Sequence, residues 1–384
     1  MCGITGYVGD RDCADVLVDA LSKLEYRGYD SAGIAVFEKG TIKVEKCKGR
    51  LANLVDKMAV DGKPQGHCGI GHTRWATHGE PSDINSHPHG NKRVSIVHNG
   101  IIENYKQIKD FLIEEGYSFV SETDTETVAK LLDYYYVDDP VDTIIKVLSE
   151  IKGSYALGIM FRDYPDTVFA VRKECPLIVG VGENENFLAS DVPAIIKYTR
   201  DYYLLEANEI AVVKKDSVQI YDMHKEPVHK EINTADWDVD AAEKGGYEHF
   251  MLKEIHEQPA AVRDTVSPRI INGMPDLSQD GVDMQKLKDY RQIFIVACGT
   301  AMHAGMVGKY VIEKLARKPV IVDIASEFRY RDPIITKDDL MIVISQSGET
   351  ADTMAVLRLA KEVGAATLAV VNVVGSSIAR EADM

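Results

Sequence analysis

The pattern of hydrophobic segments changes near residue 236, and this change restricts the chain to two domains of different fold class. Up to about residue 225, short β-rich runs, several bounded by Gly or Pro, are separated by only a few helices. Beyond Tyr290, apolar strands and helices alternate. A polar stretch of small residues between the two parts, Asp236 to Gly246, has the composition of a linker. We therefore expect an α+β domain followed by an α/β domain.

The first part has the features of a layered α+β domain. Helices are predicted at Asp12–Leu24 and at Glu103–Glu115, the second of which is ended by Gly116. Lys39-Gly40, between two strands, predicts a hairpin and therefore antiparallel pairing. The predicted strands are Gly3–Val8, Ala32–Glu38, Ile42–Lys46, Cys68–Thr73, Val94–His98, Tyr155–Phe161, Val168–Arg172, Leu177–Val181 and Glu209–Lys214.

The second part predicts a parallel, doubly wound sheet, because its strands are apolar and alternate with helices. A helical stretch, Phe250 to Val266, leads into it. The chain reaches Met384 where another strand is expected, so we interpret it as a fragment. The predicted strands are Ile293–Ala297, Val320–Ile324, Leu340–Ile344 and Thr367–Val371, and the helices run from Met302 to Ala316, from Thr350 to Val363 and from Ser377 to Asp383.

Charge and cysteine content exclude several classes of protein. With 44 basic and 60 acidic residues the net charge is −16, which would repel nucleic acid and anionic membranes. Six scattered cysteines without a C-x-x-C pair are typical of reduced thiols. The N-terminus does not have the pattern of a signal peptide, and no apolar run is long enough to span a bilayer. We expect a cytoplasmic protein.

Cys2 is the first candidate catalytic residue. If Met1 is removed, the thiol and a free α-amine belong to the same residue. An α-amine titrates near pH 8, so a useful fraction is neutral and accepts the thiol proton. An N-terminal nucleophile of this kind carries its own base. A cysteine at this position is by itself more often an inert small residue, so its neighbours in the fold decide.

Three further motifs follow predicted strands or begin a helix. Arg74-Trp75-Ala76-Thr77-His78-Gly79 offers an arginine fork for a carboxylate, the alternative being a structural arginine on a loop. His98-Asn99-Gly100 offers an amide and a glycine N–H to an oxyanion, the alternative being an Asn-Gly turn. Glu122-Thr123-Asp124-Thr125-Glu126 places carboxylates at a helix start, where simple capping is equally expected.

Histidines are concentrated in one stretch, since six of the eleven fall between His67 and His98. None has the i, i+4 helical spacing or the paired cysteines that are typical of zinc ligands, and His87-Pro88-His89 lies in a polar loop. We therefore expect no metal site.

The second part carries a candidate phosphate site. Ser345-Gln346-Ser347-Gly348-Glu349-Thr350 lies between an apolar strand and a helix, where hydroxyls and the positive end of the helix suit a phosphate. An ordinary Ser/Thr helix cap is the alternative. Cys298-Gly299-Thr300 repeats this arrangement after the strand Ile293–Ala297, and Thr300 either donates to the same ligand or caps its helix.

Taken in order, these motifs resemble the N-terminal-nucleophile (Ntn) glutamine amidotransferases. More narrowly, the chain resembles the family of glutamine–fructose-6-phosphate aminotransferases (isomerizing), or glucosamine-6-phosphate synthases, over its whole length. The matching segments are Met1-Cys2-Gly3-Ile4, Leu24-Glu25-Tyr26-Arg27-Gly28-Tyr29-Asp30-Ser31-Ala32-Gly33, His72–Pro81, His98–Asn104 and Ser121–Glu126, together with Ser345–Thr350 and Glu327-Phe328-Arg329-Tyr330-Arg331.

The resemblance implies a glutaminase sandwich at residues 1–236, a linker with a lead-in helix at 237–284, and a first sugar isomerase (SIS) domain at 285–384. It implies that Cys2 attacks the glutamine amide and that Asn99 and Gly100 stabilise the oxyanion. Glutamine binding falls to Arg74, Thr77, His78 and Asp124, and Trp75 is the ammonia gate. The residues implied to bind the sugar phosphate are Thr300, Ser345, Gln346, Ser347 and Thr350.

The resemblance also implies the reaction and its partners. The substrates are L-glutamine and fructose-6-phosphate, the product is glucosamine-6-phosphate, no cofactor is needed, and the intact enzyme is a homodimer. Ala301 departs from the family, in which many members have a serine. The family's second SIS domain and C-terminal tail would lie beyond Met384, so this chain alone is expected to act only as a glutaminase.

Two alternatives remain at this stage. One is another amidotransferase with the same glutaminase, such as an amidophosphoribosyltransferase, which would need a pyrophosphate-binding loop in place of Ser345–Thr350. The other is a sugar-phosphate sensor without catalysis, in which Cys2 would have no use. Release of glutamate from glutamine distinguishes an enzyme from a sensor.

Overall fold

The structure is a computed structural model that describes residues 2–25, 28–76, 78–91, 93–235, 246–247 and 249–384. Contacts divide the chain into two compact units, Met1–Gly245 and Gly246–Met384, and each is described by itself. Most of the expected linker, residues 236–245, lies outside the described residues. Within the part that is described, no helix has both the length and the apolar character needed to cross a membrane.

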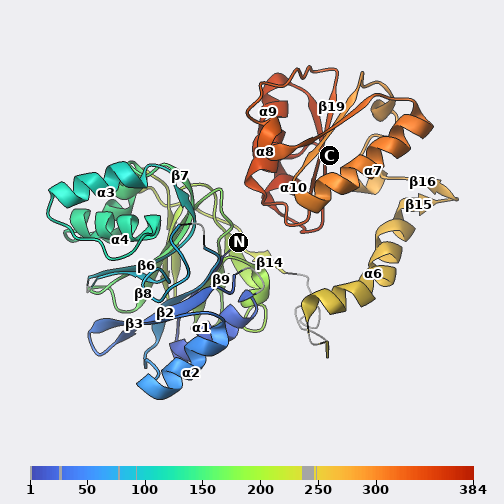
Figure 1. The fold of residues 1–384 in the computed structure, drawn as a ribbon. Coiled ribbons are helices and arrows are strands. Elements are labelled where there is room, and N and C mark those ends of the chain that lie inside the picture. The colour runs from blue at the N-terminus through green and yellow to red at the C-terminus, as the bar shows by residue number, and fades with distance from the viewer. Residues whose placement is uncertain (1, 26–27, 77, 92, 236–245, 248) are drawn as a thin grey trace. The chain divides into compact units, whose positions relative to one another are not determined.

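The first unit contains two antiparallel sheets with helices on their outer faces (Figure 1). The first sheet has the strand order β14 (Asn233–Thr234), β11 (Asp201–Leu204), β9 (Ile178–Val181), β10 (Asn186–Ala189), β1 (Gly3–Val8), β4 (Cys68–Arg74), β2 (Ser31–Glu38) and β3 (Thr41–Lys48). The second has the order β13 (Val218–Tyr221), β12 (Ile210–Lys214), β8 (Thr167–Lys173), β7 (Gly153–Phe161), β6 (Val94–Ile102) and β5 (His89–Gly90).

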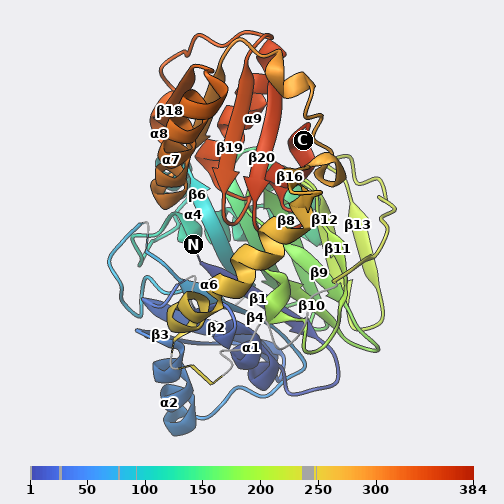
Figure 2. The same ribbon diagram turned by 90° about the vertical axis from the view of Figure 1, so that its right-hand side faces the viewer.

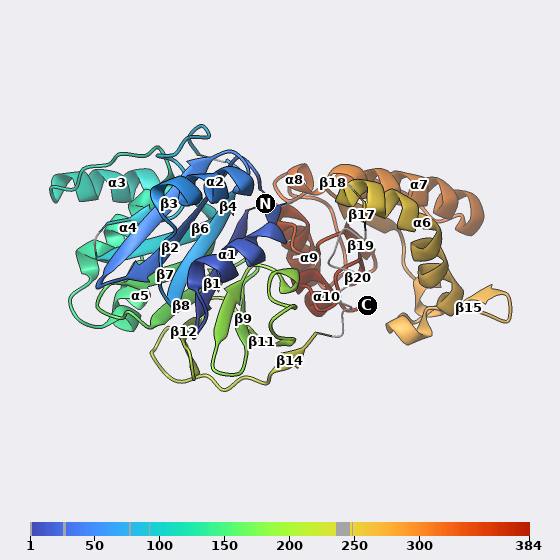
Figure 3. The same ribbon diagram turned by 90° about the horizontal axis from the view of Figure 1, so that it is seen from below.

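The central strands of these sheets are buried on both faces, and period-two alternation explains how. On β2, Ala35 belongs to the apolar cluster shared with the second sheet, whereas Ile34 and Val36 pack with helix residues such as Leu17. Burying a side chain such as Ile34 or Val36 stabilises the fold by about 1.5–3 kcal/mol. The helices on the first sheet are α1 (Cys13–Ser22) and α2 (Leu51–Asp61), and Figure 3 shows α1 lying over β1 and β4. Those on the second are α3 (Tyr105–Glu114), α4 (Asp124–Tyr135) and α5 (Pro140–Leu148).

The second unit is built on a parallel sheet whose strands run in one direction (Figure 2). Its order is β18 (Val320–Ile324), β17 (Ile293–Ala297), β19 (Leu340–Ser345) and β20 (Ala366–Val371). Helix α7 (Gly299–Ala316) packs on one face, and α8 (Ala325–Phe328) and α9 (Ala351–Val363) pack on the other. The remaining elements are α6 (Phe250–Val266), β15 (Ile270–Ile271), β16 (Met274–Pro275) and α10 (Ser377–Glu381).

Both predicted fold classes are confirmed: an α+β sandwich of two antiparallel sheets comes first, and an α/β unit with a parallel sheet follows. The predicted hairpin is also present, because Lys39 and Gly40 adopt φ of 49° and 84° between antiparallel β2 and β3. Several predicted boundaries differ from the structure. The helix expected from Met302 begins at Gly299, and the strand expected to end at His98 continues to Ile102.

Candidate functional sites

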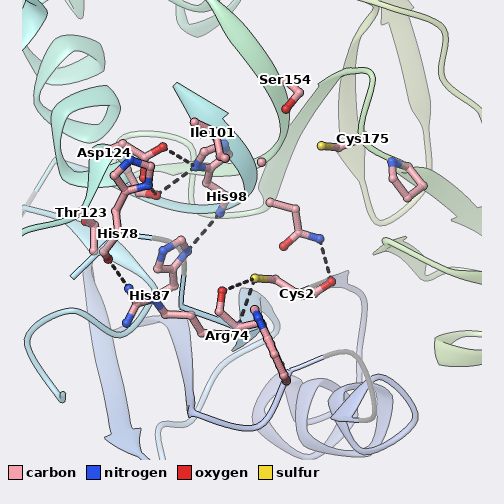
Figure 4. A pocket seen from close by; sticks show the side chains of 15 residues that line it. Cys2, Arg74, His78, His87, His98, Ile101, Thr123, Asp124, Ser154 and Cys175 are labelled. Atoms are coloured by element: carbon pink, nitrogen blue, oxygen red, sulfur yellow. Dashed lines mark hydrogen bonds and ion pairs between the residues drawn. The ribbon is translucent and has the colours of Figure 1, made fainter. Parts of the chain in front are cut away.

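A cavity of about 340 Å³ lies in the first unit where β1, β4 and β6 meet the start of α4 (Figure 4). The antiparallel register pairs Gly3 of β1 with Thr73 of β4, so the start of the chain adjoins the residues that follow β4. Most of the predicted glutaminase residues line this cavity: Cys2, Arg74, Trp75, His78, Asn99, Gly100 and Asp124. Thr77, predicted to bind glutamine, lies outside the described residues.

The Cys2 thiol faces the backbone of Trp75. Its Sγ accepts a hydrogen bond from Trp75 N at 3.2 Å and lies 3.5 Å from Trp75 O. Burial raises the pKa of the Cys2 thiol, and the Asp30 carboxylate raises it further, although the Trp75 N–H and Arg74 oppose both effects. The thiol is therefore protonated at rest, and its use as a nucleophile requires a base.

Asn99 and Gly100 lie within strand β6, so the alternative of an Asn-Gly turn is wrong. The Asn99 side chain donates from Nδ2 to Cys2 O at 3.0 Å. Gly100 pairs with Tyr155 of β7 and has φ of +126°. These two residues therefore place an amide donor and a glycine backbone beside the thiol.

Gly100→Ala is expected to destabilise the first unit by about 2 kcal/mol or more. A Cβ at this position would lie 2.1 Å from Ser154 O, and the φ is one that side chains rarely adopt. Urea unfolding measures the loss. Gly40→Ala is the matched control, because φ there is also positive while the space around the added Cβ is open. An equal loss in both variants would mean that the contact with Ser154 does not matter.

Arg74 is buried at the end of β4 and keeps part of its hydrogen-bonding capacity unused. Nη2 donates to the carbonyl oxygens of His78 and Gly79, which shapes the loop after the strand. Nη1 is buried without a hydrogen-bond partner among the described residues. The guanidinium can thus hold its own loop and still donate to a carboxylate in the cavity.

The segment around Gly28 to Ser31 packs against the backbone of Arg74 and Trp75 and holds it in place. Asp30 accepts a hydrogen bond from Ala76 N, and its own N–H donates to Arg74 O at 3.1 Å. A Cβ on Gly28 would lie 2.6 Å from the Arg74 carbonyl carbon. Sequence reasoning singled out this segment as a family motif and missed the role of Asp30, for which the motif was the only signal.

At the start of α4, capping accounts for Thr123 and Glu126, whereas Asp124 faces the cavity. Thr123 caps the helix by accepting from Glu126 N at 3.3 Å, and the Glu126 carboxylate accepts from Ser121 N at 2.6 Å. Asp124 instead lines the cavity, with Oδ2 accepting from Ile102 N at 2.8 Å. Figure 4 shows Asp124 and Cys2 separated across the cavity. The cavity therefore has the Cys2 thiol at one end and the Asp124 carboxylate at the other.

Trp75 and His78, predicted as the ammonia gate and as a glutamine-binding residue, both line the cavity. The Trp75 side chain is 48% exposed and packs edge-on against Tyr29, with ring centroids 5.4 Å apart. His78 meets the Tyr105 ring in a similar edge-on contact. The half-exposed indole of Trp75 therefore lies at the rim of the cavity, and the Trp75 backbone N–H contacts the Cys2 thiol.

Buried histidines beside the cavity were missed as site residues. His87 and His98 line it, and His72 stacks on His87 with ring centroids 4.1 Å apart. Burial lowers the pKa of His72 to about 3, so this ring is neutral. Among the described residues, no group of three or more His, Cys, Asp or Glu side chains is arranged to hold a metal ion.

The second candidate site is the tight loop after β19. Ser345 Oγ lies 3.0 Å from Thr350 Oγ1 and accepts from Gly348 N at 3.0 Å. Ser347 Oγ accepts from Glu349 N at 3.2 Å, and Gln346 is exposed. The loop thus gathers three hydroxyls before the N-terminus of α9, where backbone N–H groups favour an anion.

Ser376 and Ser377 close this loop and were not predicted. Ser377 N donates to Glu349 Oε1 at 2.8 Å. A Cβ on Gly348, which has φ of +65°, would lie 1.9 Å from Ser376 Oγ. Gly348 therefore lets the two loops pack closely, which a sequence pattern around Ser345–Thr350 alone does not reveal.

Thr300 lies in the first turn of α7, at the carboxyl end of β17. The N-cap of this helix is Cys298, so the alternative that Thr300 caps its helix is wrong. Strands β17 and β19 are parallel neighbours, so their carboxyl-terminal ends lie at the same end of the sheet. Thr300 and the Ser345–Thr350 loop therefore lie at that end, as expected for residues that bind one ligand.

Two family models match the chain. A glutamine amidotransferase domain matches residues 72–197, and a SIS domain matches residues 286–384. A glutamine–fructose-6-phosphate aminotransferase (isomerizing) of Clostridium acetobutylicum is 59% identical over 386 residues, which cover 100% of this chain and 63% of that protein. One from Aquifex aeolicus is 50% identical and covers 100% of this chain and 64% of that protein. The chain therefore spans under two thirds of the length of these relatives.

Similarity to solved structures concerns the fold. Glutamine phosphoribosylpyrophosphate amidotransferase from B. subtilis, complexed with ADP and GMP, matches with a TM-score of 0.54 at 17% identity. The match covers 97% of this chain and 81% of that chain. At this identity the likeness shows a shared fold alone.

Proposed function

We propose, on the premise that this chain belongs to the glutamine–fructose-6-phosphate aminotransferase (isomerizing) family, that its first unit releases ammonia from L-glutamine for transfer to fructose-6-phosphate. We assign residues 1–236 to the glutaminase, 237–284 to a linker with a lead-in helix, and 285–384 to a SIS domain. The observation that carries the proposal is one cavity lined by Cys2, Arg74, Asn99 and Asp124.

Glutamine hydrolysis would take place at the end of the cavity where Cys2, Asn99 and Gly100 lie. Cys2 Sγ attacks the side-chain amide carbon, ammonia leaves with the thiol proton, and water hydrolyses the thioester to glutamate. The raised pKa of the thiol requires a base, and an α-amine freed by removal of Met1 would supply it. Asn99 Nδ2 and the Gly100 N–H would stabilise the oxyanion.

Glutamine is held by its charged end. The unused Nη1 of Arg74, with His78 and Thr77, would bind the α-carboxylate, and Asp124 would pair with the ammonium group. Trp75, exposed at the rim, would close over the bound amino acid and direct ammonia away from water.

The second unit is proposed to bind the sugar phosphate. Hydroxyls of Ser345, Ser347 and Thr350, with Gln346, would hold the phosphate at the start of α9, and Thr300 would reach it from the neighbouring strand end. Ala301 in the first turn of α7 offers no hydroxyl. The whole protein would then make glucosamine-6-phosphate as a cytoplasmic homodimer, without a redox or metal cofactor.

Two measurements on the purified chain test this proposal. We expect glutamate release from glutamine, and we expect calorimetric titration to detect fructose-6-phosphate but not fructose. Ser347→Ala should weaken fructose-6-phosphate binding about tenfold or more, since a hydrogen bond to a charged group is worth about 1.5–3 kcal/mol. Ser267→Ala, exposed at the end of α6, is the control. A chain that binds the sugar phosphate and releases no glutamate would be a sensor instead.

A further inference from the structure

His72 is a buried side chain that contacts Asn99, the residue proposed to stabilise the oxyanion, on the side facing away from the cavity. It lies on β4, where it pairs with Ile4 of β1 and Gly33 of β2. Its Nε2 is 3.0 Å from Asn99 Oδ1 and also 3.0 Å from His98 O. Its side chain is fully buried and is absent from the lining of the cavity.

The two neighbours of Nε2 determine which nitrogen carries the proton. His98 O is a carbonyl oxygen and can only accept, so Nε2 must be the protonated nitrogen. The ring is neutral because burial lowers its pKa to about 3, which leaves Nδ1 without a proton. Nδ1 is buried without a hydrogen-bond partner among the described residues. A single Nε2–H is thus shared between two acceptors.

This donor fixes the orientation of the Asn99 amide. A protonated Nε2 faces the amide oxygen favourably and would repel the NH₂ group, so Oδ1 turns toward His72. Nδ2 then points the other way and donates to Cys2 O at 3.0 Å. In the flipped orientation the amide oxygen would face the developing oxyanion, which would destabilise it.

The ring itself is held in place by its neighbours. It stacks on His87, whose Nδ1 accepts from His98 N at 3.3 Å. The backbone that carries His87 is fixed by Lys46, whose Nζ donates to Ser86 O at 2.8 Å and Ile84 O at 3.1 Å. The His72 plane has little freedom to turn away from Asn99.

We propose that His72 is a positioning residue for glutamine hydrolysis, which presents Asn99 Nδ2 to the oxyanion by holding the other end of the amide. The proposal rests on the glutaminase function proposed above. His72 acts only through Asn99, which makes a sharp prediction for the two residues in combination.

A double-mutant cycle tests this dependence with glutamate release as the readout. His72→Leu is expected to lower kcat about tenfold or more, with KM for glutamine changed less than about threefold. His72→Gln, which keeps an N–H donor, should restore kcat to within about threefold of the parent protein. In an Asn99→Ala background, His72→Leu should change kcat less than about twofold. An equal loss in both backgrounds, or no loss in either, would overturn the proposal.

A second readout does not depend on catalysis. In protein labelled with ¹⁵N-histidine, the NMR shifts of His72 are expected to show the Nε2–H tautomer from pH 6 to 8. An Nδ1–H tautomer would overturn the proposal even if glutamine is hydrolysed. If the parent protein releases no glutamate, the proposed function fails, while the tautomer still decides how Asn99 is held. Should His72→Leu not fold, His72→Gln and the NMR measurement remain decisive.

Discussion

Replacement of Cys2 by alanine is expected to lower glutamine hydrolysis by about 10⁴-fold or more, because loss of a catalytic nucleophile leaves only binding and oxyanion stabilisation. The thiol lies at one end of the cavity, and Asn99 donates to its backbone carbonyl. Glutamine binding should change much less than turnover. Glutamate release measures the turnover, and calorimetric titration with glutamine measures the binding.

Two other cysteines serve as comparisons for Cys2→Ala. Cys47 lies on β3 and does not line the cavity, so Cys47→Ala is expected to keep the parent activity. Cys175 does line the cavity, together with Cys2. If Cys2→Ala still released glutamate and Cys175→Ala did not, the nucleophile would be Cys175 and the assignment of Cys2 would be wrong.

The resting state of Cys2 explains why a self-supplied base matters. Many reactive cysteines are activated by a lowered pKa, but burial and the nearby Asp30 carboxylate raise the pKa of this thiol. Burial lowers the pKa of His72, His87 and His98, so these three rings do not supply a cation that would reverse that effect. Such a thiol needs a base that accepts its proton as the sulfur attacks, and the α-amine of Cys2 is the base proposed above.

Much of the fold could be predicted because its strands are apolar runs with defined ends. Gly3–Val8 and Ile293–Ala297 were predicted with the bounds that the structure has. Short strands such as β10 and β13, and helix α2, were missed. Strands β10 and β13 have only four residues each, too few for a periodic pattern to be recognised. Helix α2 does carry an apolar stripe of Leu51, Leu54 and Met58, which was overlooked in the sequence.

In the site, residues within one motif could be predicted from the sequence, whereas contacts between residues of distant segments could not. Motifs predicted which residues face the cavity, because a run such as Arg74 to Gly79 stays together in any fold. Contacts between distant strands could not be predicted. His72 meets Asn99 through the meeting of β4 and β6, and Asp30 reaches Ala76 across β2 and β4. Such partners are set by register, which the spacing of a motif does not encode.

Asp124→Asn is expected to raise KM for glutamine about 30-fold or more while the fold persists. The amide keeps an oxygen that can accept from Ile102 N, as Asp124 Oδ2 does at 2.8 Å. It removes the charge that is proposed to pair with the substrate ammonium group, and losing one partner of a buried charge pair costs about 2 kcal/mol or more. Steady-state kinetics of glutamate release gives KM and kcat separately.

Glu126→Gln is the matched control for this change, because it also replaces a carboxylate by the corresponding amide, two residues further along α4. Glu126 binds the N–H groups of Val120 and Ser121 and pairs with Lys130, and it does not line the cavity. Its loss should lower stability toward urea and leave KM unchanged. If both variants raised KM equally, the effect would come from the position of α4, and Asp124 would have no direct part in binding the ammonium group.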